Sequence, residues 1–235
     1  MNRLFNTIRL DSLLQARNKV YLIIAVAAFA LAFALSAVFT PEQLHFFMPL
    51  VVLGSVSLTT VFLVGVLVLL ERGEGTLDVV LVSPLRPSEY LASKLITLTV
   101  LALVESAIIA IIAYGLGFSI GWLVIAVVMR ASMGIAVGVA IGVRYRSITH
   151  FLLPAILASV SFDLPNIWYL NLSASPLFYL WPSMPPLLLA KAAFMEVDTL
   201  QLVYAFVYGL VAVAAALFWA SRAIERYVVR GEIAS

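Results

Sequence analysis

Residues 71–87 read ERGEGTLDVVLVSPLRP, and this polar stretch lies between two long apolar runs. Its charged residues are Glu71, Arg72, Glu74, Asp78 and Arg86. Each unpaired ion in the hydrocarbon core of a membrane costs at least about 2.5 kcal/mol, even on the lowest insertion scales. The stretch is therefore expected in water on one face of a membrane, with the apolar runs on either side crossing it.

The composition of the whole chain also indicates a membrane protein. Of the 235 residues, 64% are hydrophobic and 11% are charged, whereas soluble chains are near 45 to 50% apolar. The apolar runs are continuous rather than alternating, which favours helices over a barrel. The absence of cysteine excludes disulfides, cysteine-ligated zinc and thiol catalysis, and the two histidines are too far apart for a recognisable metal motif.

A helix needs roughly 20 apolar residues to cross the membrane core, and about six runs meet this requirement. We therefore expect an all-α membrane protein in which residues 1–235 form a single transmembrane domain. A short polar turn is expected at Pro41, Glu42 and His45, between the first two spans. The six predicted spans cover residues 20–39, 46–70, 88–114, 122–143, 151–162 with added re-entrant pieces, and 200–220.

Two flanking segments have their own patterns. Residues 1–19 mix four basic side chains with scattered apolar ones, which predicts an N-terminal interfacial helix. A signal peptide is the alternative, but its basic and apolar regions would both be too long. Residues 163–199 hold five of the ten prolines, so we expect re-entrant helices at the outer face, packed against protein or a water-filled cavity.

The basic residues sort by side of the membrane. All except Arg130 and Lys191 lie in the N-terminal segment, in residues 71–94, at Arg144 and Arg146, or in the C-terminal tail. Lysine and arginine concentrate in cytoplasmic loops. Both termini and residues 71–87 are therefore predicted to be cytoplasmic, in a multi-pass protein.

Residues 76–81 have the pattern of a short helix within the polar stretch. Thr76 is a suitable N-cap, and Asp78 lies in the first turn, where a negative charge favours the helix dipole. Leu77, Val80 and Leu81 recur at helical spacing and form an apolar stripe. Such a stripe indicates a docking partner, and a surface connector is the alternative interpretation.

This stretch resembles a motif of type-2 ABC exporter permeases. The pattern E-x-x-x-G-T-L-[DE]-x-[LV]-[LV]-x-[ST]-P is found there in a coupling helix that docks on the ATPase. Residues 144–148 with 151–154 (RYRSI, FLLP) and residues 176–180 (PLFYL) are similar to the fluoroquinolone-export permease subgroup. The ATPase-coupling residues that the resemblance implies are Glu71, Gly75, Thr76, Leu77, Asp78, Val80, Leu81 and Pro84.

The resemblance implies a half-transporter of the prokaryotic plasma (inner) membrane that exports a hydrophobic or amphipathic small molecule, such as a drug or lipid. Two such membrane domains, identical or sister permeases, would work with two ABC ATPase subunits. The chain has no G-x-x-x-x-G-K-[ST] phosphate loop, so ATP and Mg are expected on the partner ATPase. No catalytic residue, metal, cofactor or nucleic-acid partner is expected for this chain.

Two other classes of membrane protein are compatible with the composition. A membrane-embedded enzyme is disfavoured, because the chain has no H-E-x-x-H motif and no Asp-rich metal cluster. A self-contained secondary transporter or channel subunit is favoured by the broken helices and the intramembrane charges. The motif in residues 71–84 argues against a self-contained carrier, which does not require an exposed apolar stripe with this motif.

Two ionisable residues are predicted deep in the membrane. Glu105 is eleven residues past Lys94, roughly 16 Å along a helix, and Arg130 is fourteen residues before Arg144, roughly 21 Å. Buried membrane charges usually pair, so a Glu105–Arg130 pair between neighbouring spans is expected. The alternatives are a Glu105 that lines the transport pathway, or some other arrangement. Asp163 is interpreted as a helix-end residue at the outer face.

Overall fold

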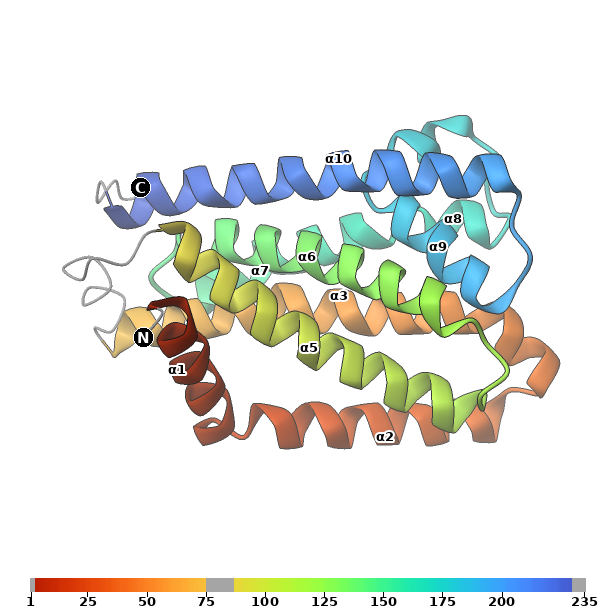
Figure 1. Ribbon diagram of the computed structural model, residues 1–235, viewed down its shortest axis with the longest axis horizontal. Coiled ribbons are helices and arrows are strands. Elements are labelled where there is room, and N and C mark those ends of the chain that lie inside the picture. The colour runs from red at the N-terminus through yellow and green to blue at the C-terminus, as the bar shows by residue number, and fades with distance from the viewer. Residues whose placement is uncertain (1–2, 75–86, 230–235) are drawn as a thin grey trace.

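The computed structural model describes residues 3–74 and 87–229, and within these ranges the chain forms helices joined by short connections. Six of the helices are long and apolar enough to cross a membrane, which confirms the predicted all-α membrane protein. Figure 1 shows the long helices running side by side as one bundle. The helices in chain order are α1 (Arg3–Arg17), α2 (Val20–Val38), α3 (Pro41–Gly73), α5 (Pro87–Ala113), α6 (Ile120–Gly142), α7 (Ile148–Asp163), α8 (Asn166–Tyr169), η1 (Pro176–Leu180), α9 (Met184–Phe194), α10 (Thr199–Ile224) and η2 (Glu225–Val229).

The polar residues between the first two spans begin a helix, so the turn predicted at Pro41, Glu42 and His45 is wrong. Thr40 caps α3: its hydroxyl accepts from the backbone N–H of Gln43, and the Gln43 side chain accepts from the N–H of Thr40. This reciprocal capping box, followed by proline in the first turn, is a strong helix start. With 33 residues, α3 is about 50 Å long and exceeds the ~30 Å core.

The fifth span is longer than the sequence indicated. Helix α7 leads into the short α8, and together residues 148–169 are long and apolar enough to cross a membrane. After η1, α9 begins with Pro185 and Pro186 in its first turn, where proline costs no hydrogen bond. Nearly every residue of α9 is buried. Its position relative to the outer face of a membrane stays a prediction.

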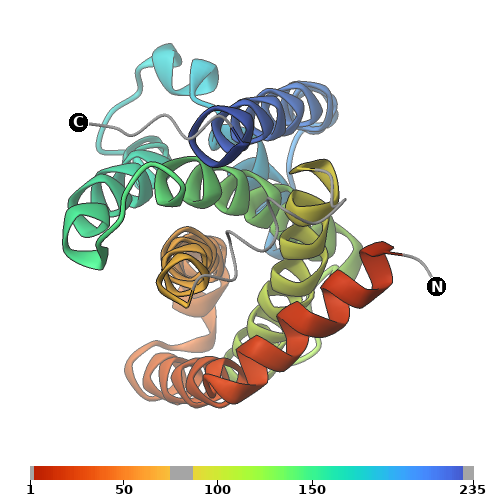
Figure 2. The same cartoon turned by 90° about the vertical axis from the view of Figure 1, so that its left-hand side faces the viewer.

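One end of the bundle gathers the segments that flank residues 75–86. Figures 1 and 2 show α1 crossing obliquely at the end where α3 and α10 finish and α5 begins. Helix α1 packs mainly on α5. Residues 3–17 therefore form a helix, as the sequence indicated, and its place at a membrane surface stays a prediction.

Helices α3 and α6 share the most extensive contact in the described bundle, and it includes close approach of their backbones. A Cβ at Gly134 would lie 2.1 Å from Oγ1 of Thr60, and a Cβ at Gly138 would lie 2.6 Å from the carbonyl oxygen of Val61. Gly142 continues this line against Gly65. Small residues let helix backbones approach closely in lipid. The glycines in the second half of α6 therefore allow it to lie directly against α3.

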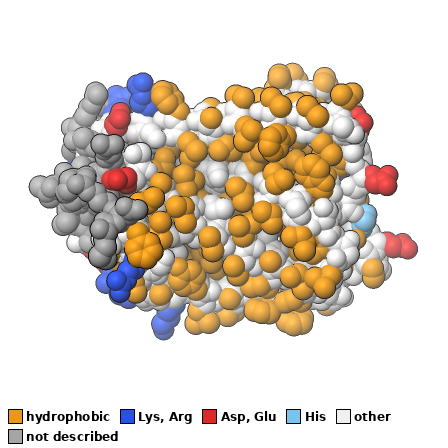
Figure 3. Space-filling view, in the orientation of Figure 1, with side chains coloured by type: hydrophobic (Ala, Val, Ile, Leu, Met, Phe, Trp, Pro, Cys, Tyr) orange, Lys and Arg blue, Asp and Glu red, His pale blue; other side chains and the backbone are white. Residues whose placement is uncertain are grey.

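The outer helices leave a wide apolar surface exposed. In the most apolar 18-residue stretch of α6, an inner helix, 72% of the residues are buried. In the corresponding stretch of the last span, residues 199–228, only 11% are buried. Figure 3 shows a broad hydrophobic band between two ends that carry the charged side chains. A surface this apolar is stable only against lipid or another apolar protein surface.

Replacing Gly138 by Ala tests the α3–α6 contact. The new Cβ would lie 2.3 Å from Cγ1 of Val64 and 2.6 Å from the backbone carbonyl oxygen of Val61, and because this backbone cannot turn aside, the helices must shift. We expect a loss of about 1–3 kcal/mol, as for other overpacked cores, measured as a lower unfolding midpoint by tryptophan fluorescence in detergent.

The matched control is Gly54→Ala in the middle of α3, where no atom lies within 4 Å of the added Cβ. Alanine is the better helix former, so this variant should unfold at the wild-type temperature or slightly above it. Equal midpoints for Gly138→Ala and Gly54→Ala would contradict the close contact.

Candidate functional site

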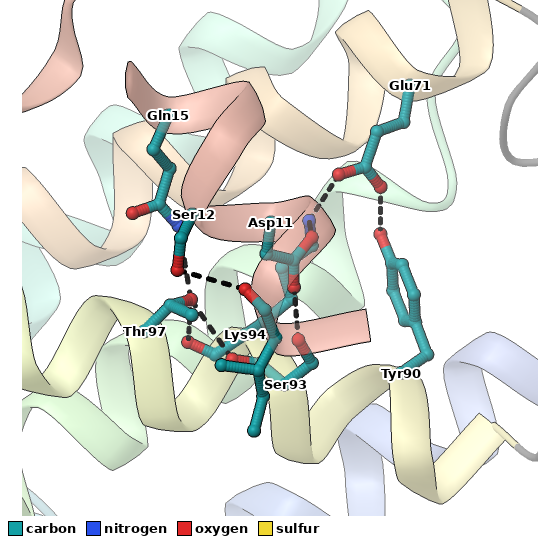
Figure 4. Close-up of polar contacts among 9 residues, drawn as sticks. Asp11, Ser12, Gln15, Glu71, Tyr90, Ser93, Lys94 and Thr97 are labelled. Atoms are coloured by element: carbon teal, nitrogen blue, oxygen red, sulfur yellow. Dashed lines mark hydrogen bonds and ion pairs between the residues drawn. The ribbon is translucent and has the colours of Figure 1, made fainter. Parts of the chain in front are cut away.

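Five side chains form a buried polar cluster where α1, α3 and α5 meet, next to residues 75–86. We call Asp11, Glu71, Tyr90, Ser93 and Lys94 the Lys94 cluster (Figure 4). The Lys94 ammonium lies 2.7 Å from Oδ1 of Asp11 and also forms an ion pair with Oε1 of Glu71. One lysine of α5 therefore binds a carboxylate from each of the other two helices.

The remaining carboxylate oxygens of the cluster are also satisfied. Ser93 donates a 2.5 Å hydrogen bond to Oδ2 of Asp11, and the Tyr90 hydroxyl donates a 2.7 Å bond to Oε2 of Glu71. One turn away, Gln15 donates to the hydroxyl of Thr97 at 3.1 Å. These bonds hold α1 and α3 on one face of α5.

The cluster is hidden from solvent. Lys94 is 1% exposed, Asp11 5% and Glu71 7%. Buried ions are stable only when geometry and additional hydrogen bonds offset their desolvation, and removal of one partner costs about 3–5 kcal/mol. The three helices therefore cannot separate at this point without leaving an unpaired charge.

A second set of contacts joins the same end of α3 to the rest of the bundle. Arg72 donates hydrogen bonds to the backbone carbonyls of Val143 and Tyr145, at 3.0 and 2.8 Å. These carbonyls follow the last turn of α6, where a cation is favourable. The Arg144 guanidinium lies over the rings of Trp219 and Tyr227. The connection after α6 is thereby tied to both α3 and α10.

The residues predicted to couple to an ATPase are only partly within the described ranges. Glu71 is described and belongs to the Lys94 cluster, where it faces α5. Its role in coupling stays a prediction. The predicted coupling residues outside the described residues are Gly75, Thr76, Leu77, Asp78, Val80, Leu81 and Pro84.

Sequence reasoning missed Asp11. Its signal was available, because it is the one acidic residue among the basic side chains of residues 1–19. Lys94 was assigned no partner from the sequence and was counted only among the basic residues predicted on the cytoplasmic side. Neither pattern indicates that α1 folds back onto α5, since the two residues are 83 positions apart.

Arg130 pairs with Asp163, so the predicted Glu105–Arg130 pair is wrong. The Arg130 Nη2 atom lies 2.7 Å from Oδ1 of Asp163, Nη1 donates to the Phe162 carbonyl at 3.0 Å, and Nε donates to Ser57 at 2.6 Å. Arg130 is one turn before Gly134, on the face of α6 that packs against α3. It therefore points to α3 and the end of α7.

Glu105 lies elsewhere, on α5. Its Oε1 atom accepts a 3.1 Å hydrogen bond from the Thr59 hydroxyl of α3, and the residue is 5% exposed. Among the described residues, its Oε2 atom has no hydrogen-bond partner. It lines a groove between α1, α2 and α5. Its predicted alternative role, lining a pathway, stays a prediction.

Residues 117–121 read GFSIG and have the spacing of a serine-hydrolase nucleophile turn. That turn joins a β-strand to a helix. Here Ser119 lies between two helices as the residue before α6, and its backbone N–H donates to the Ala193 carbonyl. The spacing is therefore part of a helix–helix connection and does not build a nucleophile turn.

Comparison with known proteins gives one consistent result. The sequence model of the fluoroquinolones export permease protein family matches residues 2–232. Two relatives from two strains of Mycobacterium tuberculosis, both named fluoroquinolones export permease protein, are each 32% identical to this chain over 233 residues. The similarity covers 98% of this chain and 98% of each relative.

Replacing Lys94 by Met tests the cluster. The variant leaves two buried carboxylates without their cation, so we expect a loss of about 3–5 kcal/mol and a lower unfolding midpoint in detergent. Neutralising both acids in the same background, with Asp11→Asn and Glu71→Gln, should restore part of the loss.

Lys191→Met is the matched control. Lys191 is half-buried in α9 and lies over the rings of Trp168 and Tyr169. Its removal should cost at most about 2 kcal/mol, as expected for a cation–π contact. If Lys94→Met unfolds no earlier than Lys191→Met, the cluster does not hold the three helices together.

Proposed function

The chain belongs to the fluoroquinolones export permease protein family, and from this premise we propose that it is the membrane-spanning permease subunit of an ATP-driven ABC exporter. The proposed cargo is a hydrophobic or amphipathic small molecule, moved out of the cytoplasm. A separate ATPase subunit would bind ATP and Mg. The main support for this proposal is the family match over nearly the whole chain, which includes the G-T-L-D motif at residues 75–78.

The absence of a nucleotide-binding motif supports a separate motor. The sequence has no G-x-x-x-x-G-K-[ST] loop, the usual cradle for ATP phosphates. The six apolar helices and the short connections of the described ranges are consistent with a purely membrane-embedded subunit. Residues 71–87 are the proposed docking segment for the ATPase.

The orientation follows from charge. On the face shown in Figure 3, lysine and arginine gather at one end of the bundle together with some acidic side chains, whereas the other end shows acidic side chains and a histidine without lysine or arginine. The positive-inside rule assigns the basic end to the cytoplasm. We therefore propose a prokaryotic plasma-membrane protein with both termini cytoplasmic and α9 toward the outer face.

The Lys94 cluster supplies a path for force from a docked motor. Residues 75–86 are attached to the end of α3 and the start of α5, and Lys94 binds both α3 and α1. A push on the docking segment would therefore displace three helices together. Movement of these helices would change access to the transport pathway.

A second permease subunit, either a copy of this chain or a sister, is also proposed. Helices α2, α7 and α10 expose large apolar side chains along much of their length. Part of this surface would face lipid, and part would face the second subunit. The alternative is a self-contained secondary transporter or channel subunit, for which the intramembrane Arg130–Asp163 pair is the favouring observation.

Co-purification decides between these functions. The tagged chain is expressed with its candidate ATPase, extracted in mild detergent and weighed by native mass spectrometry. Two ATPase chains with two membrane chains are expected. A stable permease recovered without any ATPase would favour the self-contained carrier.

Charge reversal at Asp78 tests the docking segment. Asp78→Arg should reduce the recovery of the ATPase at least about tenfold, the effect of losing ~1.4 kcal/mol of binding. Glu196→Arg is the control, because this exposed acid precedes α10 at the opposite end of the bundle. Glu71 is unsuitable for this purpose, since its substitution also breaks the Lys94 cluster. Unchanged ATPase recovery with Asp78→Arg would exclude the segment as the docking site.

A further inference from the structure

A groove of about 420 Å³ lies on the outer surface of the bundle between α1, α2 and α5. Figure 2 shows α1 lying across the neighbouring helices α2 and α5. The walls are mainly apolar, with Ile8, Ile24, Val100, Val104 and Ile108 among them. The groove therefore suits an apolar chain that enters from the lipid.

Of the described residues that line this groove, Glu105 is the only one with a carboxylate. It differs from the other buried acids of the described ranges, because Asp11 and Glu71 both form ion pairs with Lys94. Among the described residues, no lysine or arginine lies within ion-pair distance of Glu105. The Thr59 hydroxyl donates to one carboxylate oxygen, and the Ser55 hydroxyl also interacts with the carboxylate, so its polar neighbours there are neutral hydroxyls; Oε2 has no hydrogen bond to a described residue.

The groove extends from the basic end of the bundle to the depth of Glu105. It includes Ser12 of α1 at that end, and along α5 it reaches from Ile96 to Ile108, roughly 18 Å of helix. A ligand from the cytoplasmic side of the membrane would therefore meet apolar walls first and the carboxylate at mid-depth.

A buried membrane carboxylate without a cation is stabilised by a ligand that brings one. We propose that this groove binds a single-chain amphiphile carrying a protonated amine, with the ammonium against Glu105 and the apolar chain along α5. The part of the groove lining that the structure describes contains no lysine or arginine. A phospholipid headgroup would place its phosphate near Glu105 without a cation to bind it, which disfavours phospholipid as the occupant.

Binding of the amine requires no ATPase and does not depend on the proposed export function. Only the further role of the amine as exported cargo rests on that function. The probe is decylamine bearing a photoreactive diazirine, applied to the purified full-length chain in phosphatidylcholine nanodiscs. Labelled residues are mapped by mass spectrometry, and unlabelled decylamine competes for saturable sites. The diazirine analogue of decanol has the same chain without the charge.

Saturable labelling of residues 96–108 by the amine is expected, with apparent affinity at least about tenfold above that of the alcohol. Glu105→Gln is nearly isosteric and should lower the amine affinity by a similar factor while leaving the alcohol unaffected. Glu196→Gln, which neutralises an exposed acid outside this groove, should leave both unchanged. Nanodiscs containing phosphatidylethanolamine should label like those of phosphatidylcholine alone.

Several results would overturn the proposal. Equal affinities for amine and alcohol, or an unchanged amine affinity in Glu105→Gln, would show that the carboxylate does not select the ligand. Loss of labelling in phosphatidylethanolamine would make the lipid headgroup the occupant. If Glu105→Gln fails to fold, Val104→Trp is the second test, because the larger side chain fills the groove without changing its charge. Wild-type labelling in Val104→Trp would exclude the groove as the binding site.

The export function and the amine-binding groove can be refuted independently of each other. Amine labelling without ATPase co-purification would leave the groove as a binding site in a protein of another transport class. ATPase co-purification without saturable amine labelling would leave the exporter proposal intact and remove this ligand class.

Discussion

The ion pairs of Lys94 with Asp11 and Glu71 are the constraint on which the basic end of the bundle depends. A lysine buried this deeply is stable only with anions beside it, and two buried carboxylates are stable only with a cation between them. Because each of the three residues comes from a different helix, this requirement fixes α1, α3 and α5 relative to one another. The segment at residues 75–86 begins and ends on two of those helices.

A different kind of contact fixes the middle of the bundle. Lipid offers no hydrophobic driving force between helices, so packing depends on close approach and interhelical hydrogen bonds. Gly134 and Gly138 allow α6 to touch α3, and one turn earlier Arg130 reaches Ser57 and Asp163. The small residues and the charged one therefore use the same face of α6. That shared face explains how an arginine is accommodated in the interior.

The ionisable residues show where prediction from sequence succeeds and where it stops. The depth of Arg130 and Glu105 along their spans follows from counting residues, and both lie buried within helices long and apolar enough to cross a membrane. Their partners were not, because residues on a helix rotate by about 100° per position and the facing helix is unknown from sequence. Glu71 was singled out by its motif, whereas Asp11, its companion on Lys94, carried no motif.

The sequence by itself determined that the chain is helical, that six of its segments are long enough to span a membrane, and which family it belongs to. These properties are sums or patterns along a contiguous stretch, since an apolar run of about 20 residues is sufficient for a span whatever its neighbours are. Only the tertiary structure decided that Arg130 meets Asp163, that Lys94 joins three helices, and that Glu105 lines a groove without a cation. Those outcomes depend on the rotation and neighbours of each helix, because an ion pair requires two side chains to meet within a few ångströms in space.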